Sequence, residues 1–586
     1  MDLTFDALII GAGVIGCAIA RELSRYKLKI GILEKASDLF YGNSARNSGV
    51  LHAGFNNVPG SLMARFCVEG NKSFDDLARE LGIPYRRTGK LVVGFTKKDR
   101  EKLEEMIATG ERNGVPGLAV IGKDKIKELA PQVAGEFAMW SGSTAILDPF
   151  AYVLALAQNA HKNGVRFFFD SEVTAIRECL SDADRSSGAV GSSSVTPNNG
   201  ASTHTATSDP AIAPVCSSML HIPAAPASSS TPYTSAVPVD SSMLHTPAAP
   251  ANSNTPHTPT AFADSSMLHM PAAPTDSSTP HTPTAPVYAV SAGGHTYSAR
   301  WIINCAGLGA DKIAKMLGCD KYTIHPCRGE YYVLDRIVGS LLPLPAYPVP
   351  DPKAGGLGIH LTPTMDGNIL VGPSDEYITD ADDYSTTRKI MDLLIRDGSR
   401  IFPYLKGEYF IRNFSGIRPK LAPKEQGGYH DFIIERDDVH PRAVNLIGLE
   451  SPAMTGALPI SREVLRLMRQ VEAFEPNPYF DPIRPAGTIF RDLPKEEQAK
   501  LIRQNPDYGE IVCRCENITK AEVLEAIRGP IGARTVIGVK YRCRAMMGRC
   551  QGGYCQARLC DILMKELGLA CDEVQYSPLP GSNMFT

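Results

Sequence analysis

Three glycines near the N-terminus place the tightest constraint on the fold. Gly11, Gly13 and Gly16 occur in LIIGAGVIG, and the following CAIARELSRYKLKIGILEK reads as a helix and a strand that lead to Glu34. The first glycine permits a tight turn, the second lets the backbone approach a pyrophosphate, and the third lets the helix pack on the strand. The helix N-terminus faces the phosphates, and the acidic residue accepts from ribose hydroxyls. The segment therefore predicts a Rossmann-type unit that binds a dinucleotide.

Four cysteines near the C-terminus predict a metal centre. One residue separates Cys513 from Cys515, and four residues separate Cys550 from Cys555. Thiolates select soft metals, above all iron–sulfur clusters and zinc. Structural zinc usually pairs its cysteines at wider spacing, so the one-residue gap favours an iron–sulfur cluster. Zinc, or a relic of such a site that holds no metal, is the alternative.

Other residues near these cysteines have simpler interpretations. Nearby cations suit a negatively charged cluster and raise its reduction potential; the candidates are Arg514, Lys540, Arg542, Arg544 and Arg549. Three further cysteines are interpreted as small buried hydrophobic residues; they are Cys543, Cys560 and Cys571.

Composition indicates a large enzyme with no bias toward nucleic acid or a membrane surface. The chain has 586 residues, 43% of them hydrophobic, and a net charge of −3, enough to bury two or three cores. The apolar run over residues 7–20 is too short to span a bilayer and lacks a basic leader, so we expect neither a signal peptide nor membrane insertion. Fourteen cysteines indicate a reducing compartment, and we expect a cytoplasmic protein.

A low-complexity insertion interrupts the chain over residues 181–286. It is rich in Ser, Thr, Pro and Ala, and SSML recurs at Ser217, Ser241 and Ser265. Frequent proline and scarce aromatic residues predict disorder. The flanking segments read as strands of one meander, so we expect the insertion to extend from a hairpin. The predicted organisation is a split oxidoreductase domain (1–180 and 287–475), a linker (476–507) and a cluster domain (508–575).

Motifs along most of the chain resemble known flavoproteins. The segments TAILDPFAYVLALA, INCAGLGAD, CRGEYYVL, GIHLTPTMDGNILVGP and FSGIRPKL resemble the L-2-hydroxyglutarate dehydrogenases and oxidases of the D-amino-acid-oxidase-like superfamily. LFYGNSARNSGVLHAGF matches the stretch that runs along the flavin in that superfamily. The resemblance implies an α/β fold, in which a Rossmann-type FAD-binding domain is interleaved with an α+β substrate domain.

The C-terminal region carries a second resemblance. Residues 508–575 are similar to bacterioferritin-associated-ferredoxin-like domains, whose four cysteines hold a 2Fe-2S cluster and match the four cysteines here one for one. The resemblance implies a small helical iron–sulfur domain. A flavin domain followed by such a domain resembles the large subunit of anaerobic glycerol-3-phosphate dehydrogenase.

The flavoprotein resemblance implies a set of FAD contacts. A helix N-terminus after GLESPAMTG is expected near the flavin pyrimidine, where its positive end stabilises the reduced anionic flavin. The implied contacts are Gly11, Gly13, Gly16, Glu34, Asn47, Ser48, Val173, Gly307, Gly448, Ser451 and Met454.

Oxidation next to a hydroxyl requires a base and, for an anionic substrate, cations. His52 and His360 are the candidate bases in matched motifs, with a purely structural histidine as the alternative for each. Arg328 and Arg418 are the candidates for binding the acid group, and a surface ion pair is the alternative for each.

These features predict an FAD-dependent dehydrogenase of a small anionic 2-hydroxy acid, with L-2-hydroxyglutarate the nearest family substrate. A one-electron cluster implies a protein or quinone acceptor, such as an electron-accepting flavoprotein or a membrane-linked carrier. Glycerol 3-phosphate oxidation is the nearest alternative, although LESPAMTG lacks the lysine usual near this position in such enzymes. Amine or opine oxidation, and a non-catalytic iron–sulfur electron-transfer or scaffold protein, are the others.

Overall fold

The computed structural model describes residues 3–179, 288–350, 358–579 and 581–585. The predicted repeat insertion over residues 181–286 lies outside them. The helices are α1 Val14–Leu23, α2 Leu62–Leu81, α3 Lys97–Arg112, α4 Lys123–Leu129, α5 Pro149–Lys162, α7 Ala310–Met316, α8 Arg388–Ile401, α9 Ala457–Arg469, α10 Lys495–Gln504, α11 Lys520–Arg528, α12 Val536–Cys543 and α13 Gln556–Leu567. Short 3-10 helices are η1 Asn43–Ala45, η2 Gly307–Gly309, η3 Arg336–Leu341, η4 Gly407–Tyr409, η5 Lys424–Gln426, η6 Phe490–Asp492, η7 Pro506–Gly509 and η8 Cys571–Glu573.

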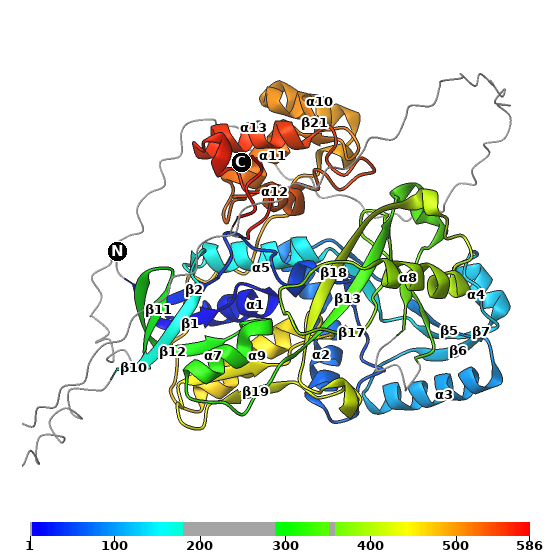
Figure 1. Ribbon diagram of the computed structural model, residues 1–586, viewed down its shortest axis with the longest axis horizontal. Coiled ribbons are helices and arrows are strands. Elements are labelled where there is room, and N and C mark those ends of the chain that lie inside the picture. The colour runs from blue at the N-terminus through cyan, green and yellow to red at the C-terminus, as the bar shows by residue number, and fades with distance from the viewer. Residues whose placement is uncertain (1–2, 180–287, 351–357, 580, 586) are drawn as a thin grey trace, which may run out of the picture. The chain divides into compact units, whose positions relative to one another are not determined.

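The first large sheet is of the Rossmann type that the glycine motif predicts (Figure 1). Its strands are β1 Thr4–Ile10, β2 Ile30–Leu33, β9 Arg166–Phe168, β10 Val173–Glu178, β11 Tyr288–Ala292, β12 His295–Asn304, β19 Ile433–Arg436 and β20 Ala443–Ile447. The central strand β1 runs parallel to both β12 and β2, and β9 and β20 extend the parallel part. Helix α1 connects β1 to β2, as a βαβ unit requires.

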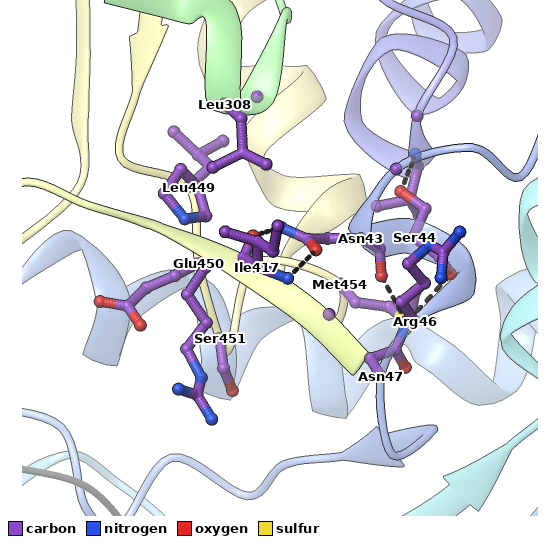
Figure 2. Close-up of a pocket in the computed structure, with 18 of the residues that line it drawn as sticks. Asn43, Ser44, Arg46, Asn47, Leu308, Ile417, Leu449, Glu450, Ser451 and Met454 are labelled. Atoms are coloured by element: carbon purple, nitrogen blue, oxygen red, sulfur yellow. Dashed lines mark hydrogen bonds between the residues drawn. The ribbon is translucent and has the colours of Figure 1, made fainter. Parts of the chain in front are cut away.

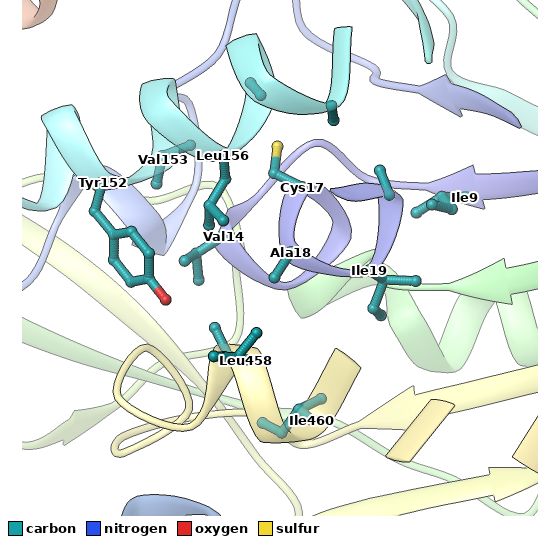
Figure 3. Packing of buried hydrophobic residues seen from close by; sticks show 14 of the residues in the cluster. Ile9, Val14, Cys17, Ala18, Ile19, Tyr152, Val153, Leu156, Leu458 and Ile460 are labelled. Atoms are coloured by element: carbon teal, nitrogen blue, oxygen red, sulfur yellow. The ribbon is translucent and has the colours of Figure 1, made fainter. Parts of the chain in front are cut away.

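Apolar side chains alternate across β1 and build a core on each face of this sheet. Ala7 and Ile9 join a core with α1, α5 and α9, whereas Phe5, Leu8 and Ile10 join a core with the β10–β12 meander. Burial on both faces explains why the strand reads as an unbroken apolar run. Figure 3 shows the helix-side core, in which residues of α1 pack against side chains of α5 and α9.

The predicted meander around the insertion is confirmed. Strands β10 and β11 pair antiparallel from Val173 opposite Ala292 to Glu178 opposite Tyr288, and β11 continues antiparallel to β12. The insertion therefore connects the two strands of one hairpin, where an added segment costs little loop-closure entropy.

The second large sheet carries the remainder of the oxidoreductase region. Its strands are β5 Lys90–Gly94, β6 Leu118–Gly122, β7 Phe137–Ser141, β13 His325–Leu334, β14 Ala346–Pro348, β15 His360–Pro363, β16 Ile369–Gly372, β17 Glu376–Tyr377 and β18 Phe410–Lys420. Their order is β17-β13-β16-β15-β14-β5-β7-β6, and β18 pairs with β13. A small third sheet joins β3 Val50–Leu51, β8 Ala145–Leu147 and β4 Tyr85–Arg86. The chain alternates between the two large sheets, because β5–β7 of the second sheet come between β2 and β9 of the first. The two predicted parts of the oxidoreductase domain are therefore interleaved.

The C-terminal domain is small and mostly helical, as expected. Strands β21 Ile511–Cys513 and β22 Ile518–Thr519 form a hairpin, and α11–α13 surround an apolar core. The segment predicted as a linker contains α10 and holds buried Phe490. Among the described helices, none combines the length and apolarity needed to cross a membrane.

Candidate active site

A cavity of about 960 Å³ is lined by residues of both large sheets. Its wall is formed by residues of strands β5, β13, β15 and β18 and by five further segments, which are residues 10–15, 38–44, 46–50, 305–309 and 449–455. Such a volume lies at the upper end of ligand pockets, which run from roughly 300 to 1,000 Å³. The predicted cofactor and substrate residues can therefore be compared within one cavity.

The glycine loop forms a cradle at one end of this cavity. Gly11 has a φ of +106°, and a Cβ there would lie 2.5 Å from the carbonyl oxygen of Cys305. A Cβ on Gly16 would lie 2.0 Å from the carbonyl oxygen of Gly11, so this glycine permits the close helix–strand packing. Gly11 and Gly13 line the cavity, where their backbone is open to a pyrophosphate.

Glu34 lies at the same end, as its position after β2 predicts. Its carboxylate accepts the N–H of Ala12 at 2.8 Å and the N–H of Ala36 at 3.0 Å. Burial raises the pKa of this carboxyl, and the two N–H groups act against the increase. The glycine cradle and this acid fit the phosphates and ribose of a dinucleotide.

Residues 43–50 join the glycine loop to the second sheet. The Oγ of Ser44 accepts the N–H of Val14 at 2.9 Å, and Asn43 Oδ1 accepts the N–H of Ile417 at 2.8 Å. Asn47 donates to the carbonyls of Asn43 at 3.0 Å and Ser44 at 2.9 Å. Figure 2 shows these side chains at the cavity wall, with Ser451 and Met454 of the loop before α9.

The other predicted cofactor residues divide into those that line the cavity and those that do not. The first group is Ser48, Val173, Gly307, Ser451 and Met454.

Gly448 and Gly16 do not line the cavity. A Cβ on Gly448, whose φ is +71°, would lie 2.4 Å from Leu421 Cδ1, so this glycine serves packing. Helix α9 begins at Ala457, directly after the cavity-lining loop 449–455.

Both candidate histidines line the cavity. His52 Nε2 lies 3.4 Å from Ser451 Oγ, and burial, with Lys90 and His360 nearby, lowers the pKa of His52 well below its usual value. His360 Nδ1 lies 2.9 Å from the carbonyl oxygen of Gly358, and burial lowers its pKa to about 3. Because a carbonyl can only accept, Nδ1 carries the proton and Nε2 is a free acceptor. Both rings are therefore neutral and able to accept a hydrogen bond from a hydroxyl.

The two candidate arginines have different environments. Arg418 lines the cavity and donates through Nη2 to the carbonyl of Ser374 at 2.9 Å. Arg328 contacts Asp383 at 2.5 Å and Glu376 at 2.9 Å and does not line the cavity. Successive residues of β13 face opposite sides, so Gly329 faces the cavity while Arg328 points away. The expectation that Arg328 binds substrate therefore has no support from its position.

Two lysines that the sequence motifs did not single out also line the cavity. Lys90 begins β5 and Lys420 ends β18, and both are buried. Lys420 Nζ lies 3.2 Å from Glu450 Oε1. A lysine opening the apolar run KLVVG was the available signal for Lys90, because an unpaired lysine is rarely buried.

The four predicted cluster ligands lie in two short segments of the C-terminal domain, one at the end of β21 and one directly before α13. Their thiols interact in two pairs, Cys513 with Cys555 and Cys515 with Cys550. Within the described residues, no three His, Cys, Asp or Glu side chains are grouped to hold a single metal ion. Two thiolate pairs are the donor set for the two irons of a 2Fe-2S cluster, so these residues fit that cluster better than one zinc ion.

Backbone conformation around these cysteines also suits a cluster. N–H groups of Glu516 and Met546 approach the thiol of Cys513, and those of Gly552 and Tyr554 approach the thiol of Cys550. Hydrogen bonds to the sulfurs set the reduction potential of such clusters. Left-handed backbone, which is costly away from glycine, recurs in these loops at Asn517, Arg544, Met546 and Gln551.

Most of the basic residues predicted to surround the cluster make ion pairs instead. Arg542 forms a buried two-point contact with Asp38, at 2.6 and 2.9 Å. Arg544 contacts Asp366 at 2.6 Å, and Arg549 contacts Asp335 at 3.5 Å. Lys540 is buried, which with neighbouring arginines lowers its pKa well below the usual value. Arg514 is exposed.

The three remaining cysteines of this domain differ in burial. Cys560 is buried in the domain core as predicted and Cys543 is partly buried, but Cys571 is exposed, so that prediction was wrong for Cys571. It lies in η8, a short turn after α13 in which no residue is buried.

Comparison with known proteins agrees with this arrangement. The chain is 31% identical to a protein named glycerol 3-phosphate dehydrogenase from Caloramator mitchellensis over 574 residues, covering 97% of this chain and 96% of the relative. It is 27% identical to the mitochondrial L-2-hydroxyglutarate dehydrogenase of Nematostella vectensis, covering 78% of this chain and 89% of the relative.

A solved structure shares the fold. The dithionite-reduced L-alpha-glycerophosphate oxidase from Mycoplasma pneumoniae with FAD bound matches with a TM-score of 0.61 and 24% identity, over 83% of this chain and 100% of that chain.

Family models match both parts of the chain. The BFD-like [2Fe-2S] binding domain matches residues 511–565, which contain all four cysteines. The model of FAD dependent oxidoreductases matches residues 6–255 and 280–467. The chain therefore belongs to the FAD dependent oxidoreductase family, and its cofactors are FAD and a 2Fe-2S cluster.

Proposed function

We propose that this protein is a dehydrogenase that oxidises the CH–OH group of a small anionic alcohol and passes the electrons to a protein or quinone acceptor. The observation that carries the proposal is the composition of the cavity beyond the glycine loop. Two neutral histidines, Arg418 and Lys90 line this one cavity. When bound, FAD accepts a hydride equivalent and the 2Fe-2S cluster carries single electrons.

His52 is the proposed base. It lies on the cavity-lining segment that begins at Asn43, and its Nε2 is next to Ser451 of the loop before α9. This position brings the imidazole between the cofactor-binding segments and the remainder of the cavity, where it can accept the hydroxyl proton. His360 lies on β15, and we propose that its free Nε2 orients the substrate by accepting a hydrogen bond.

The acid group of the substrate is proposed to bind at Arg418. The guanidinium is anchored by the carbonyl of Ser374 and lies 3.5 Å from Asp375 Oδ1. Anchoring of one terminal nitrogen orients the planar fork, which suits carboxylate or phosphate.

Glycerol 3-phosphate and L-2-hydroxyglutarate are the two substrates to test. The expectation of a carboxylate depended on the missing lysine in loop 449–456, but Lys90 and Lys420 supply lysines to the same cavity. The full-length relative named glycerol 3-phosphate dehydrogenase covers both domains, which favours the phosphate ester. The relatives named L-2-hydroxyglutarate dehydrogenase keep the hydroxy acid as the second candidate.

The acceptor is proposed to be a second flavoprotein or a membrane-linked carrier. A cluster that takes one electron at a time is well placed between a two-electron flavin and a separate carrier. This part of the proposal depends on the four cysteines rather than on the cavity.

Anaerobic bleaching of the flavin tests the proposal. Glycerol 3-phosphate or L-2-hydroxyglutarate should bleach it rapidly, while uncharged glycerol and D-2-hydroxyglutarate should not. Bleaching by an amine or opine with release of amine would replace the proposal by C–N oxidation. No bleaching by any of these compounds would favour a non-catalytic electron-transfer protein.

A further inference from the structure

Lys90 occupies an unusual position in the cavity. Its side chain is 1% exposed, and the backbone is fixed by pairing of β5 with β7 and β14. The ammonium lies 4.5 Å from the ring centre of Phe55 and 4.2 Å from that of Tyr347. Aromatic faces attract a cation but replace only part of its lost hydration.

No described carboxylate lies within ion-pair distance of Lys90 Nζ. The contrast is with Lys420, the other buried lysine of the cavity, which pairs with Glu450 at 3.2 Å. A buried charge is normally paired, because desolvating it without a counter-charge is costly. Among the described residues, the Lys90 ammonium therefore has no counter-charge.

A neighbouring group is also incomplete. His360 is 4% exposed, its ring stacks on Tyr347 with centres 3.7 Å apart, and its Nε2 has no hydrogen-bond partner in the described part of the chain. A buried acceptor without a donor has lost its hydration without replacement. One wall of the cavity thus holds Lys90, Tyr347 and His360. Within the part of the chain that the structure describes, its cation has no counter-ion and its acceptor has no donor.

We propose that Lys90 is a specificity-determining residue whose ammonium binds an acidic group, carboxylate or phosphate, of the substrate. This inference rests on the proposed function and adds a second cation to Arg418. For a dicarboxylate the two cations can each bind one end. For a phosphate ester they share one doubly charged group.

Charge on Lys90 makes anion binding pH dependent. Four titratable groups lie around the Lys90 ammonium. Tyr347 contacts it with its ring, and the other three are His52, His360 and Cys67 of α2. Burial lowers the pKa of Lys90 to about 7, and both histidines are already neutral at that pH. Anion affinity should therefore be highest below pH 7 and fall as the pH rises through it.

Lys90→Met tests the proposal, with Lys123→Met as the matched control. Lys123 is an exposed lysine of α4 that pairs with Glu136 at 2.8 Å. Lys90→Met should raise KM for the active anionic substrate roughly tenfold or more, with a smaller change in kcat, because an ion-paired contact is lost. Lys123→Met should match the wild type. Equal KM values in Lys90→Met and wild type would overturn the inference.

Binding without turnover separates this inference from the proposed function. Glutarate and inorganic phosphate are titrated into the oxidised holoenzyme, and the visible spectrum of the flavin is followed. The wild type should bind at least one of them, and Lys90→Met should bind it roughly tenfold more weakly. This holds even if neither proposed substrate bleaches the flavin. Wild-type protein that binds neither anion would overturn the inference.

Lys90→Arg covers the case in which Lys90→Met fails to fold. Arginine keeps its charge throughout the accessible pH range, so the variant should bind the anion with little change between pH 6 and pH 9, spanning the pKa of about 7. Wild-type affinity should fall over that interval. An equal fall in Lys90→Arg would assign the pH dependence to another group and contradict the proposal.

Discussion

The two ends of the cavity differ in how completely their polar groups are satisfied. At the cofactor end, the carboxylate of Glu34 accepts two backbone N–H groups, and Ser44 accepts a third from α1. At the substrate end, Lys90 has no described counter-ion and His360 Nε2 has no described partner. The cofactor end is organised by its own hydrogen bonds, whereas the substrate end retains unsatisfied groups that a ligand can complete.

This difference separates binding of a resident cofactor from recognition of a substrate that must leave. A cradle whose shape depends on glycine backbone is complete before the ligand arrives. A cation and an acceptor left without partners make the empty site costly, and a substrate that supplies both contacts recovers that cost. Changes at the cofactor end should therefore affect folding and FAD content, and changes at the substrate end should affect turnover.

The largest effect is expected outside the cavity, at the cluster. Cys550→Ser removes one of the four thiolates and should abolish electron delivery to an added acceptor, because the cluster loses a ligand. Substrate should still bleach the flavin, since both ends of the cavity are intact. Iron and sulfide content, acceptor reduction and anaerobic bleaching are the measurements.

Cys560→Ala is the control for Cys550→Ser. Cys560 is buried in the same domain, and its loss should leave iron and sulfide content unchanged. Full acceptor reduction by a cluster-free Cys550→Ser enzyme would exclude the cluster from the electron path.

Loss of the proposed base should have the next largest effect. His52→Asn should lower the rate of flavin bleaching by about 10²–10⁴-fold with a smaller change in substrate affinity, as for removal of a general base. His360→Asn should change affinity more than rate, because its proposed role is to orient the substrate. Stopped-flow reduction over a range of substrate concentrations separates the two effects. If His360→Asn shows the larger loss of rate, the two roles are exchanged.

A substitution in the glycine loop tests the cofactor end. Gly16→Ala places a Cβ 2.0 Å from the carbonyl oxygen of Gly11, and forcing the helix from the strand should destabilise the protein by about 1–3 kcal/mol. FAD per chain and the thermal unfolding midpoint should both fall. Gly122→Ala is the control, because its added Cβ meets no atom within 4 Å. Normal FAD content and stability in Gly16→Ala would contradict the packing role.

The same difference explains which parts could be predicted from sequence. The glycine loop, Glu34 and the two cysteine pairs are short-range patterns whose spacing carries the geometry. Lys90 reaches the cavity only because β5 pairs with β14, with Leu91 opposite Ala346, a contact between residues far apart in the chain. No local pattern reports such a pairing.

Arg328 shows a second limit of local patterns. Its motif CRGEYYVL forms most of β13, and this strand is buried on both faces, with Arg328, Gly329 and Glu330 all buried. The polar and apolar residues of this strand therefore do not indicate which side chains face the cavity. A shift of one position moves each side chain to the opposite face of the sheet. The fold could be predicted from the motifs, whereas the facing of each strand had to come from the structure.

The smallest expected effect is on the pH dependence of the free energy of unfolding, and it tests whether the substrate end of the cavity lacks a counter-charge for Lys90. Lys90 has a pKa of about 7 in the folded protein against 10.5 for an ordinary lysine. Above pH 7 the unfolded chain therefore binds a proton that the folded chain has lost, so this group makes folding more favourable as the pH rises toward 10.5.

Between pH 7 and pH 9 the free energy of unfolding of the wild type should therefore rise by up to about 2 kcal/mol relative to that of Lys90→Met. Burial raises the pKa of the Cys67 thiol from 9.0 to about 12, so this thiol stays protonated in both folded proteins over the interval. Denaturant unfolding at the two pH values measures the difference, and a saturating anion should remove it by holding the ammonium charged. Parallel pH dependence in both proteins would mean that Lys90 already has a counter-charge, and that the substrate end is as complete as the cofactor end.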